Sequence, residues 1–255
     1  MNSELQTKSL KNILLPNERK SALKTLGYYI LFFIIGTNLL VIFSMIWLVI
    51  FDHLFDFNLS DLQINSFIDN FGVYADLISD VLSLYWLYYY TKKHGILTLR
   101  KINLTWKDLL LIVGSFIAIT LFSYGITKVF EIFDASVQTP DNQSVVENYL
   151  KISPLPMIIS AVFLAPLKEE WLTRKLIIGS IFKNHPVIGV IVSSLCFGAL
   201  HMIAGFSIYG LLQYSIAGLL FGILYVRTKK IEVSIAAHFL NNFISICIFY
   251  FSSLK

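Results

Sequence analysis

Long stretches without a charged side chain restrict the fold of this sequence more than any other feature. Thr25 to Phe51, Leu109 to Thr127 and Val233 to Leu254 contain no Asp, Glu, Lys or Arg. Each stretch reaches about the 20 residues that a membrane-spanning helix needs. Asn184 to Val226 also lacks all four residue types and is long enough for two spans, with a turn predicted near Ala204 to Phe206. The sequence therefore predicts several helices that cross a membrane.

The composition agrees with that prediction. Of the 255 residues, 56% are hydrophobic and 14% are charged, whereas about 25% of the residues of a soluble domain are charged. The mean hydropathy is +0.70. We therefore predict an all-α fold, a polytopic transmembrane helical bundle in the cell membrane, with membrane lipid around it. We count about seven spans, at residues 26–51, 68–91, 108–128, 154–182, 186–203, 207–226 and 232–252.

The first two spans differ in how apolar they are. The first is longer than the apolar core of a signal peptide, which has about 7–15 residues, so we expect it to stay in the mature protein. The second carries Asp69, Asp76 and Asp80 in its first half. We expect Asp76 and Asp80 to be solvated at the outer end of that span.

Basic residues cluster in three of the segments that flank the predicted spans. Because Lys and Arg are enriched on the cytoplasmic side of a membrane, these segments should be cytoplasmic. The N-terminus then faces the cytoplasm and, with seven spans, the C-terminus faces outward. The net charge of +4 mostly reflects this bias, so we expect no nucleic-acid partner. The basic residues lie before the first span (Lys8, Lys11, Arg19, Lys20, Lys24), after the second (Lys92, Lys93, Arg100, Lys101, Lys107) and after the sixth (Arg227, Lys229, Lys230).

Polar side chains inside the apolar stretches are the informative ones. Ionisable groups at membrane depth are costly and usually mark a pathway or a site. The segment LKEEWLTRKL, residues 167–176, brings several charged side chains into a predicted span. Three pairs have i, i+4 spacing, which puts both members on one face of a helix. The pairs are Glu170 with Arg174, beside Glu169; Phe197 with His201; and His238 with Asn242.

Each pair also has a purely structural interpretation. His201 alone could be a packing residue that donates a hydrogen bond to a nearby carbonyl. Asn242 could form a hydrogen bond between helices that is worth about 1 kcal/mol or less. Glu170 and Arg174 could be a buried ion pair that only fixes the position of a helix.

One connection has a pattern of its own. In TPDNQSVVENYL, residues 139–150, Asp141 or Asn142 could cap a short amphipathic helix. Such a helix would lie at the membrane surface before the fourth span. We expect it to be an interfacial lid at most.

Taken together, the three pairs resemble a known family signature. Glu-Glu-x-x-x-Arg at 169–174, Phe-x-x-x-His at 197–201 and His-x-x-x-Asn at 238–242 resemble, in order and in apolar context, the motifs of the CAAX prenyl protease and bacteriocin-processing (CPBP, or Abi) family of intramembrane proteases. The resemblance covers roughly residues 145 to 245. It implies a variable transmembrane region of three spans at 26–138 and a catalytic transmembrane domain at 139–255. The basic residues before the first span indicate a cytoplasmic N-terminal arm at 1–25.

The residue types suit the protease that this resemblance implies. Peptide hydrolysis needs an activated water, stabilisation of an oxyanion and a proton donor for the leaving amine. A carboxylate at membrane depth suits a general base, and we predict that role for Glu169. His201 would position the water, while His238 and Asn242 would donate to the oxyanion. The predicted catalytic set is Glu169, Glu170, Arg174, His201, His238 and Asn242, with Arg174 keeping Glu170 ionised.

A metal-dependent version of the same site stays open, because the family is commonly described as metal-dependent. Two His and one Glu, with one position left for water, are the ligands of many hydrolytic zinc sites. Glu169, His201 and His238 would then hold Zn²⁺ or another divalent metal, and the other Glu would be the base. In the alternative version the site needs no metal.

We therefore predict an intramembrane metallo- or glutamate-dependent endopeptidase with a catalytic cavity between the fourth, fifth and seventh spans. At about 1.5 Å per residue, Glu169 lies roughly 22 Å from the outer end of its span and His238 roughly 10 Å from the cytoplasmic end of its own. Cleavage near the cytoplasmic side, in a cavity open to that side, follows from this depth. The substrate would be a peptide or protein, and the resemblance points to a bacteriocin or pheromone precursor and to bacteriocin processing or self-immunity.

Two alternatives are a non-proteolytic bacteriocin immunity protein and a transporter or proton relay, for which charged groups in a cavity are also expected.

Overall fold

Helices form all of the regular structure in the described part of the chain. The structure is a computed structural model that describes residues 18–96, 102–133, 137 and 139–253. Within these ranges no residue lies in a β-strand, so the all-α fold class is confirmed. Of the predicted arm at 1–25, residues 1–17 lie outside the described residues, and from Glu18 onward the chain is already helical.

Seven long helical segments coincide with the seven predicted spans. The first helix is continuous from Glu18 to Phe55 and the fourth segment is continuous over residues 154–181. The first contains η1 (Ile30–Ile35, π-helical) and α2 (Gly36–Phe55), and is followed by α3 (Asp61–Lys93) and α4 (Trp106–Ile132). The 154–181 segment consists of α6 (Pro154–Ile158), η2 (Ile159–Leu164, π-helical), α7 (Ala165–Glu170) and η3 (Trp171–Ile181, π-helical), and α8 (Pro186–Leu200), α9 (Ile208–Thr228) and α10 (Ile231–Ser253) complete the bundle.

Length and composition qualify four of the described helices as membrane spans. They are Glu18–Phe55, Trp106–Ile132, Ile208–Thr228 and Ile231–Ser252, and α8 is an apolar helix of shorter length. The chain is therefore a multi-pass membrane protein. A total of seven crossings and a cytoplasmic N-terminus stay predictions.

The short helix predicted before the fourth segment is present as α5 (Asp141–Ile152). Its predicted cap is wrong, because Pro140 occupies the N-cap position and Asp141 is the first helical residue. A carboxylate in the first turn still favours the helix, since it faces the positive end of the helix dipole.

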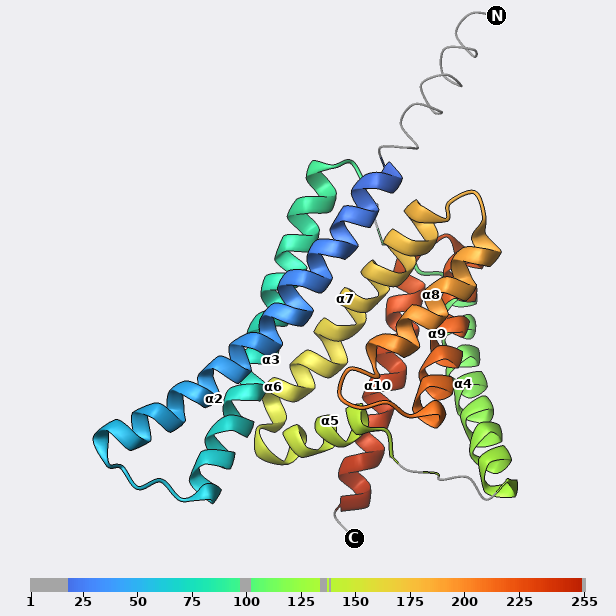
Figure 1. The fold of residues 1–255 in the computed structure, drawn as a ribbon. Helices are drawn as coiled ribbons and strands as arrows, with labels where there is room; N and C mark the ends of the chain where they lie inside the picture. Colours follow the sequence, from blue (N-terminus) through green and yellow to red (C-terminus); the bar gives the residue numbers. More distant parts are fainter. Residues whose placement is uncertain (1–17, 97–101, 134–136, 138, 254–255) are drawn as a thin grey trace, which may run out of the picture.

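Figure 1 shows how the helices are arranged. The Glu18–Phe55 helix and α3 run side by side on one side of the molecule, and α4, α8, α9 and α10 gather on the other. The 154–181 segment lies between the two groups. The first helix begins at one end of the bundle, whereas α5 and the end of α10 lie at the opposite end (Figure 1). We call the Glu18–Phe55 helix and α3 the N-terminal helix pair.

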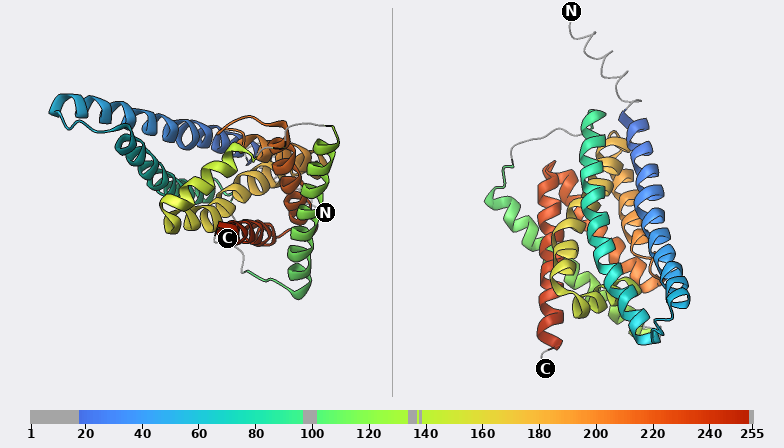
Figure 2. Two further views of the ribbon diagram at one scale, coloured as in Figure 1. Left: turned by 90° about the horizontal axis from the view of Figure 1, so that it is seen from below. Right: turned by 90° about the vertical axis from the view of Figure 1, so that its left-hand side faces the viewer.

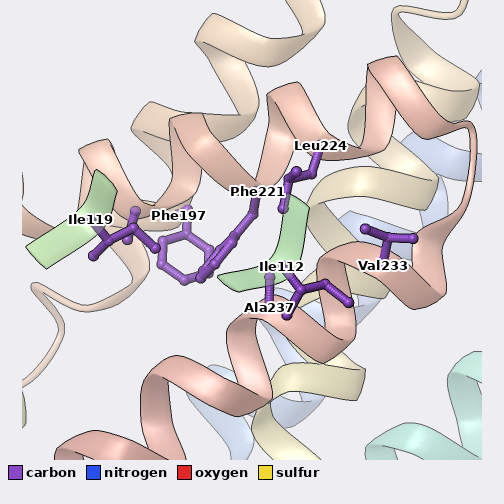
Figure 3. Close-up of a cluster of buried hydrophobic side chains, with 8 residues drawn as sticks. Ile112, Ile119, Phe197, Phe221, Leu224, Val233 and Ala237 are labelled. Carbon is purple, nitrogen blue, oxygen red and sulfur yellow. The ribbon is translucent and has the colours of Figure 1, made fainter. Parts of the chain in front are cut away.

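Two clusters of buried apolar side chains hold these groups together. One joins α4, α8, α9 and α10, where Phe197 lies beside Phe221 (Figure 3). The other joins the N-terminal helix pair to η3. Inside a membrane, close packing at small residues contributes much of helix association. At Gly198, for example, an added Cβ would lie 2.9 Å from the carbonyl oxygen of Leu211, so only glycine allows α8 and α9 to approach this closely.

One part of the N-terminal helix pair lies apart from the bundle. No residue of α2 is buried in the described structure, and Phe43 and Trp47 are 66% and 56% exposed. Figure 2 shows the end of α2 and the start of α3 reaching away from the other helices. In a membrane protein such an apolar surface faces lipid.

Candidate active site

The adjacent carboxylates Glu169 and Glu170 lie between two π-helical segments. They end α7, with η2 before them and η3 after them. Single π-helical turns inside α-helices occur frequently at functional sites. Because the regular hydrogen-bond ladder is interrupted there, backbone carbonyls can take partners from other helices. Asn242 Nδ2 donates to the carbonyl oxygen of Ala161, in η2, at 2.9 Å.

Glu169, His201 and His238 converge on one point, although they come from three separate segments. Glu169 Oε2 lies 3.7 Å from His201 Nε2 and 3.9 Å from His238 Nε2. This oxygen is buried and has no hydrogen-bond partner among the residues that the structure describes. The predicted convergence of these three side chains is thus confirmed, while their catalytic roles stay predictions.

The second nitrogen of each imidazole is already engaged. His201 Nδ1 lies 2.9 Å from the carbonyl oxygen of Phe197, and His238 Nδ1 lies 3.1 Å from Glu170 Oε1. Carbonyl and carboxylate oxygens accept hydrogen bonds, so in the neutral rings each Nδ1 carries the proton and each Nε2 presents a lone pair. Three lone-pair atoms, Glu169 Oε2 and the two Nε2 atoms, therefore face one another.

Glu170 and Arg174 form the buried ion pair that their spacing predicted. Arg174 Nε lies 2.8 Å from Glu170 Oε2, and both side chains are fully buried. Arg174 also donates to Glu170 Oε1 at 3.2 Å and to Ser193 Oγ at 2.7 Å. Because Glu170 accepts from His238 as well, the ion pair fixes the orientation of one of the two imidazoles.

Two phenylalanine rings enclose these polar groups. The Phe197 ring centre lies 4.8 Å from that of His201, 5.4 Å from that of His238 and 5.3 Å from the guanidinium carbon of Arg174. Phe221 stacks on His238 at 4.9 Å and 20°. Phe197 was predicted from its motif, but Phe221 was not, because no spacing distinguishes it from the many other phenylalanines of the chain.

A cavity of about 500 Å³ borders the cluster. Glu169, His201 and Asn242 line it, together with Lys168. The prediction that the fourth, fifth and seventh spans line the cavity is incomplete. The N-terminal helix pair and α5 form the rest of the wall. The polar residues of that wall are Tyr29, Thr37, Asn38, Asp76, Ser79, Asp80, Asn142 and Tyr149.

The cavity extends toward the end of the bundle at which α5 lies. Its lining includes side chains of α5 and, in the loop after α8, Ile203 and Ala204. Figure 1 places α5 and this loop away from the end at which the first helix begins. With a cytoplasmic N-terminus, the cavity would face outward, which is opposite to the direction that we predicted from depth along the helices.

A second polar network joins α3 to the 154–181 segment. Asp80 is 3% exposed; it forms an ion pair with Lys168 and accepts a hydrogen bond from Ser160. The expectation that Asp80 is solvated is therefore wrong, because α3 packs with this face against the neighbouring helix. Asp76, one turn away, lines the cavity.

The three lone-pair atoms are of the types that bind a divalent metal. In the described part of the chain, no three His, Cys, Asp or Glu side chains are arranged to hold a metal ion as they stand. Zinc bonds of about 2.0–2.2 Å at tetrahedral angles place ligand atoms about 3.4 Å apart, slightly less than the observed 3.7 and 3.9 Å. The Nδ1 hydrogen bonds are of the kind that orient metal-bound histidines. The donor types therefore suit a divalent cation, but the two distances from Glu169 Oε2 exceed those of a zinc site, so an inward shift would be needed to hold one.

Comparison with known proteins supports the resemblance. Residues 151–244, which we call the matched region, match the family described as type II CAAX prenyl endopeptidase Rce1-like. This range contains Glu169, Glu170, Arg174, Phe197, His201, His238 and Asn242, so the resemblance that the three motifs indicated is confirmed.

Two curated relatives also match. "Putative membrane peptidase YdiL" of Bacillus subtilis (strain 168) is 34% identical over 133 residues, 51% of this chain and 52% of that protein. A protein of Mycoplasma capricolum subsp. capricolum is 29% identical over 143 residues, 53% of this chain and 40% of that protein. The matches thus span about half of one relative's length and less of the other's. No solved structure matches the chain significantly.

Proposed function

We propose that this protein is a membrane endopeptidase in which Glu169 is the general base. The observation that carries the proposal is the meeting of Glu169 Oε2 with the Nε2 atoms of His201 and His238 beside a cavity. The match of residues 151–244 with an endopeptidase family supports the reaction class. The cavity volume of about 500 Å³ is sufficient for several residues of an extended peptide.

A water molecule among the three lone-pair atoms would be oriented for attack. It would donate one hydrogen to Glu169 and the other to an imidazole Nε2, which leaves its own lone pair directed at the substrate. Glu169 accepts the proton as the water oxygen attacks the peptide carbonyl carbon, and it then passes the proton to the leaving amine. His201, held through Nδ1 by the Phe197 carbonyl, keeps the water in place.

Asn242 is the better candidate for the oxyanion. Its amide uses one hydrogen for the carbonyl of Ala161, and it lines the cavity, so its second hydrogen is positioned for a developing negative charge. His238 fits the predicted oxyanion role less well, because its neutral ring presents a lone pair at Nε2. We therefore propose that His238 positions the water and donates only after it has taken a proton.

A divalent cation such as Zn²⁺ is part of the proposal as an alternative. Glu169, His201 and His238 would hold it, and its charge would lower the pKa of a bound water. Glu170 is a poor base in that version, because it is enclosed and paired with Arg174 and His238.

The test is cleavage by purified wild-type protein and by Glu169→Gln in detergent or liposomes. The probes are three internally quenched peptides: one ends in a farnesylated CAAX sequence, one is the same without the lipid, and one is a hydrophobic peptide. Gln keeps size and hydrogen bonding but accepts no proton, so the rate should fall by about 10²–10⁴ at normal protein abundance. Equal rates for the two proteins would refute the proposed base.

The metal alternative is decided in the same assay. If the cation is needed, dialysis against a chelator should abolish cleavage and Zn²⁺ should restore it. If Glu169 acts without a metal, the dialysed protein should keep its rate.

The proposal has three further parts: the orientation in the membrane, the side at which cleavage occurs and the physiological role. A cytoplasmic N-terminus is supported by the basic residues. Cleavage at the cytoplasmic side is supported by the depth of Glu169 and His238 along their helices, and the extent of the cavity toward α5 favours entry from the other side. A role in bacteriocin or pheromone processing, or in self-immunity, is supported by the family resemblance alone. If Glu169→Gln still confers immunity on a producing cell, the immunity does not depend on proteolysis.

A further inference from the structure

We propose that Tyr214, on α9, is a positioning residue that fixes the ring of His201, and that α5 holds Tyr214 in place. The proposal rests on the proposed function, because it assigns a role in the same reaction. It concerns a residue outside the three motifs and a helix whose first ten residues, 141–150, precede the matched region.

His201 occupies a position where the helix itself gives little support. It is the C-cap residue of α8, and residues 202–207 after it are not helical. The contact of Nδ1 with the Phe197 carbonyl fixes one atom of the ring. A single hydrogen bond leaves the ring plane free to turn, so the direction of Nε2 must come from packing on the ring faces.

Tyr214 supplies that packing. Its ring is nearly parallel to the His201 ring, with centres 4.1 Å apart and an angle of 19° between the planes. Phe197 also contacts the imidazole, at 4.8 Å and 36°. Stacked rings of this kind contribute about 0.5–1.5 kcal/mol beyond burial. The stacking therefore favours the orientation in which His201 Nε2 faces Glu169.

The first turn of α5 holds Tyr214 and the loop after His201 together. Asn142 Nδ2 donates to the Tyr214 hydroxyl at 3.3 Å. The neighbouring Asp141 packs so closely on Gly205, in that loop, that a Cβ there would collide with the carboxylate. Because Asn142 also lines the cavity, the same helix forms part of the substrate wall and part of the support of His201.

The first experiment compares Tyr214→Leu with Tyr214→Phe on whichever quenched peptide the wild type cleaves. Leu removes the ring, so kcat should fall about 10- to 100-fold, as expected for a misplaced group, while KM stays within about twofold because Tyr214 is not among the cavity-lining residues described. Phe keeps the ring, and its kcat should fall by less than that of Leu. If Tyr214 had only a structural role, Tyr214→Leu would lower the abundance of the protein without lowering kcat at a nearly constant KM.

Tyr209→Leu is the matched control. Tyr209 lies on the same helix, pairs edge-on with Phe130 and hydrogen-bonds Thr127, and it is not among the residues that line the cavity. Its loss should lower stability about as much as the loss of Tyr214 does and leave kcat unchanged per folded molecule. Wild-type kcat in Tyr214→Leu, or an equal fall in kcat in the Tyr209 variant, would overturn the proposal.

The second experiment keeps the proposal testable even if Tyr214→Leu fails to accumulate. Asn142→Ala should lower kcat about three- to tenfold in the wild-type background, by loss of one hydrogen bond, and should change nothing further in the Tyr214→Phe background, where the hydroxyl is absent. Equal effects in both backgrounds, or none in either, would overturn it. Absence of cleavage by the wild type would instead count against the proposed function itself, so the two failures are distinct.

Discussion

The N-terminal helix pair and the matched region bury charge in different ways. In the matched region, Glu170 and Arg174 are both fully buried, and each is partnered from within that region. In the N-terminal helix pair, Asp80 is the only buried charged side chain among the described residues. Its partners, Lys168 and Ser160, both belong to the matched region.

The difference shows what each region contributes. The matched region contains its own polar network, which orients His238 and is enclosed by Phe197 and Phe221. The N-terminal helix pair contributes a wall of the cavity and is tied to the matched region by two ion pairs, Asp80 with Lys168 beside the site and Glu18 with Lys183 outside the cavity lining. Because apolar surfaces gain little by association within lipid, such polar contacts decide where a helix docks. Three experiments test this comparison.

Glu170→Gln should have the largest effect on stability. It strands the fully buried Arg174, so the free energy of unfolding should fall by about 3–5 kcal/mol. Thermal melting of the detergent-solubilised protein measures this, at about 2–4 °C per kcal/mol for a chain of this size. Glu169→Gln is the matched control and should melt close to the wild type. Equal melting of the two variants would remove the distinction between a structural and a catalytic carboxylate.

Asp80→Asn should have an intermediate effect. It removes the carboxylate that pairs with Lys168, but the Lys168 side chain is 17% exposed and can be hydrated from the cavity, so we expect a loss of about 1–3 kcal/mol. Asp56→Asn, at an exposed residue with a left-handed backbone, is the control and should change stability by less than about 0.5 kcal/mol. The double variant Asp80→Asn, Lys168→Met should recover part of the loss. No recovery would mean that the ion pair does not join the two regions.

The smallest effects come from a pair of Phe→Leu substitutions. Phe221 is fully buried and Phe43 is 66% exposed, so loss of the ring should cost about 1–2 kcal/mol at the first and less than about 0.5 kcal/mol at the second. The loss of stability in each variant is measured by thermal melting of the detergent-solubilised protein. If Phe43→Leu is as destabilising as Phe221→Leu, α2 packs against protein and not against lipid.

Much of the fold follows from the sequence, for a simple reason. A charge-free stretch long enough to cross a membrane leaves the backbone few choices other than a helix, and all seven predicted segments are helical. Glu169, His201 and His238 were also identifiable, because buried ionisable groups are rare in such stretches and the i, i+4 partners orient them. Both signals are local.

What the sequence did not predict depends on contacts between distant residues. Asp80 and Lys168 are 88 residues apart, and no spacing rule relates them, so Asp80 was wrongly expected to be solvated. Phe221 and Tyr214 are ordinary aromatic residues of an apolar helix until the fold places them on His238 and His201. The wall that the N-terminal helix pair adds to the cavity was missed for the same reason.

The π-helical segment η2 makes chain length matter more than residue identity in this part of the protein. Deleting one residue within Ile159–Leu164 would allow an ordinary α-helix to form there. Everything after it would then turn by about 100° and move by about 1.5 Å. Glu169 would leave the cavity, although the hydropathy of the segment would scarcely change. Related chains that keep Glu169 beside the two imidazoles should therefore carry substitutions between residues 159 and 164 but no alignment gap, and a one-residue gap there would identify a chain in which this arrangement is lost.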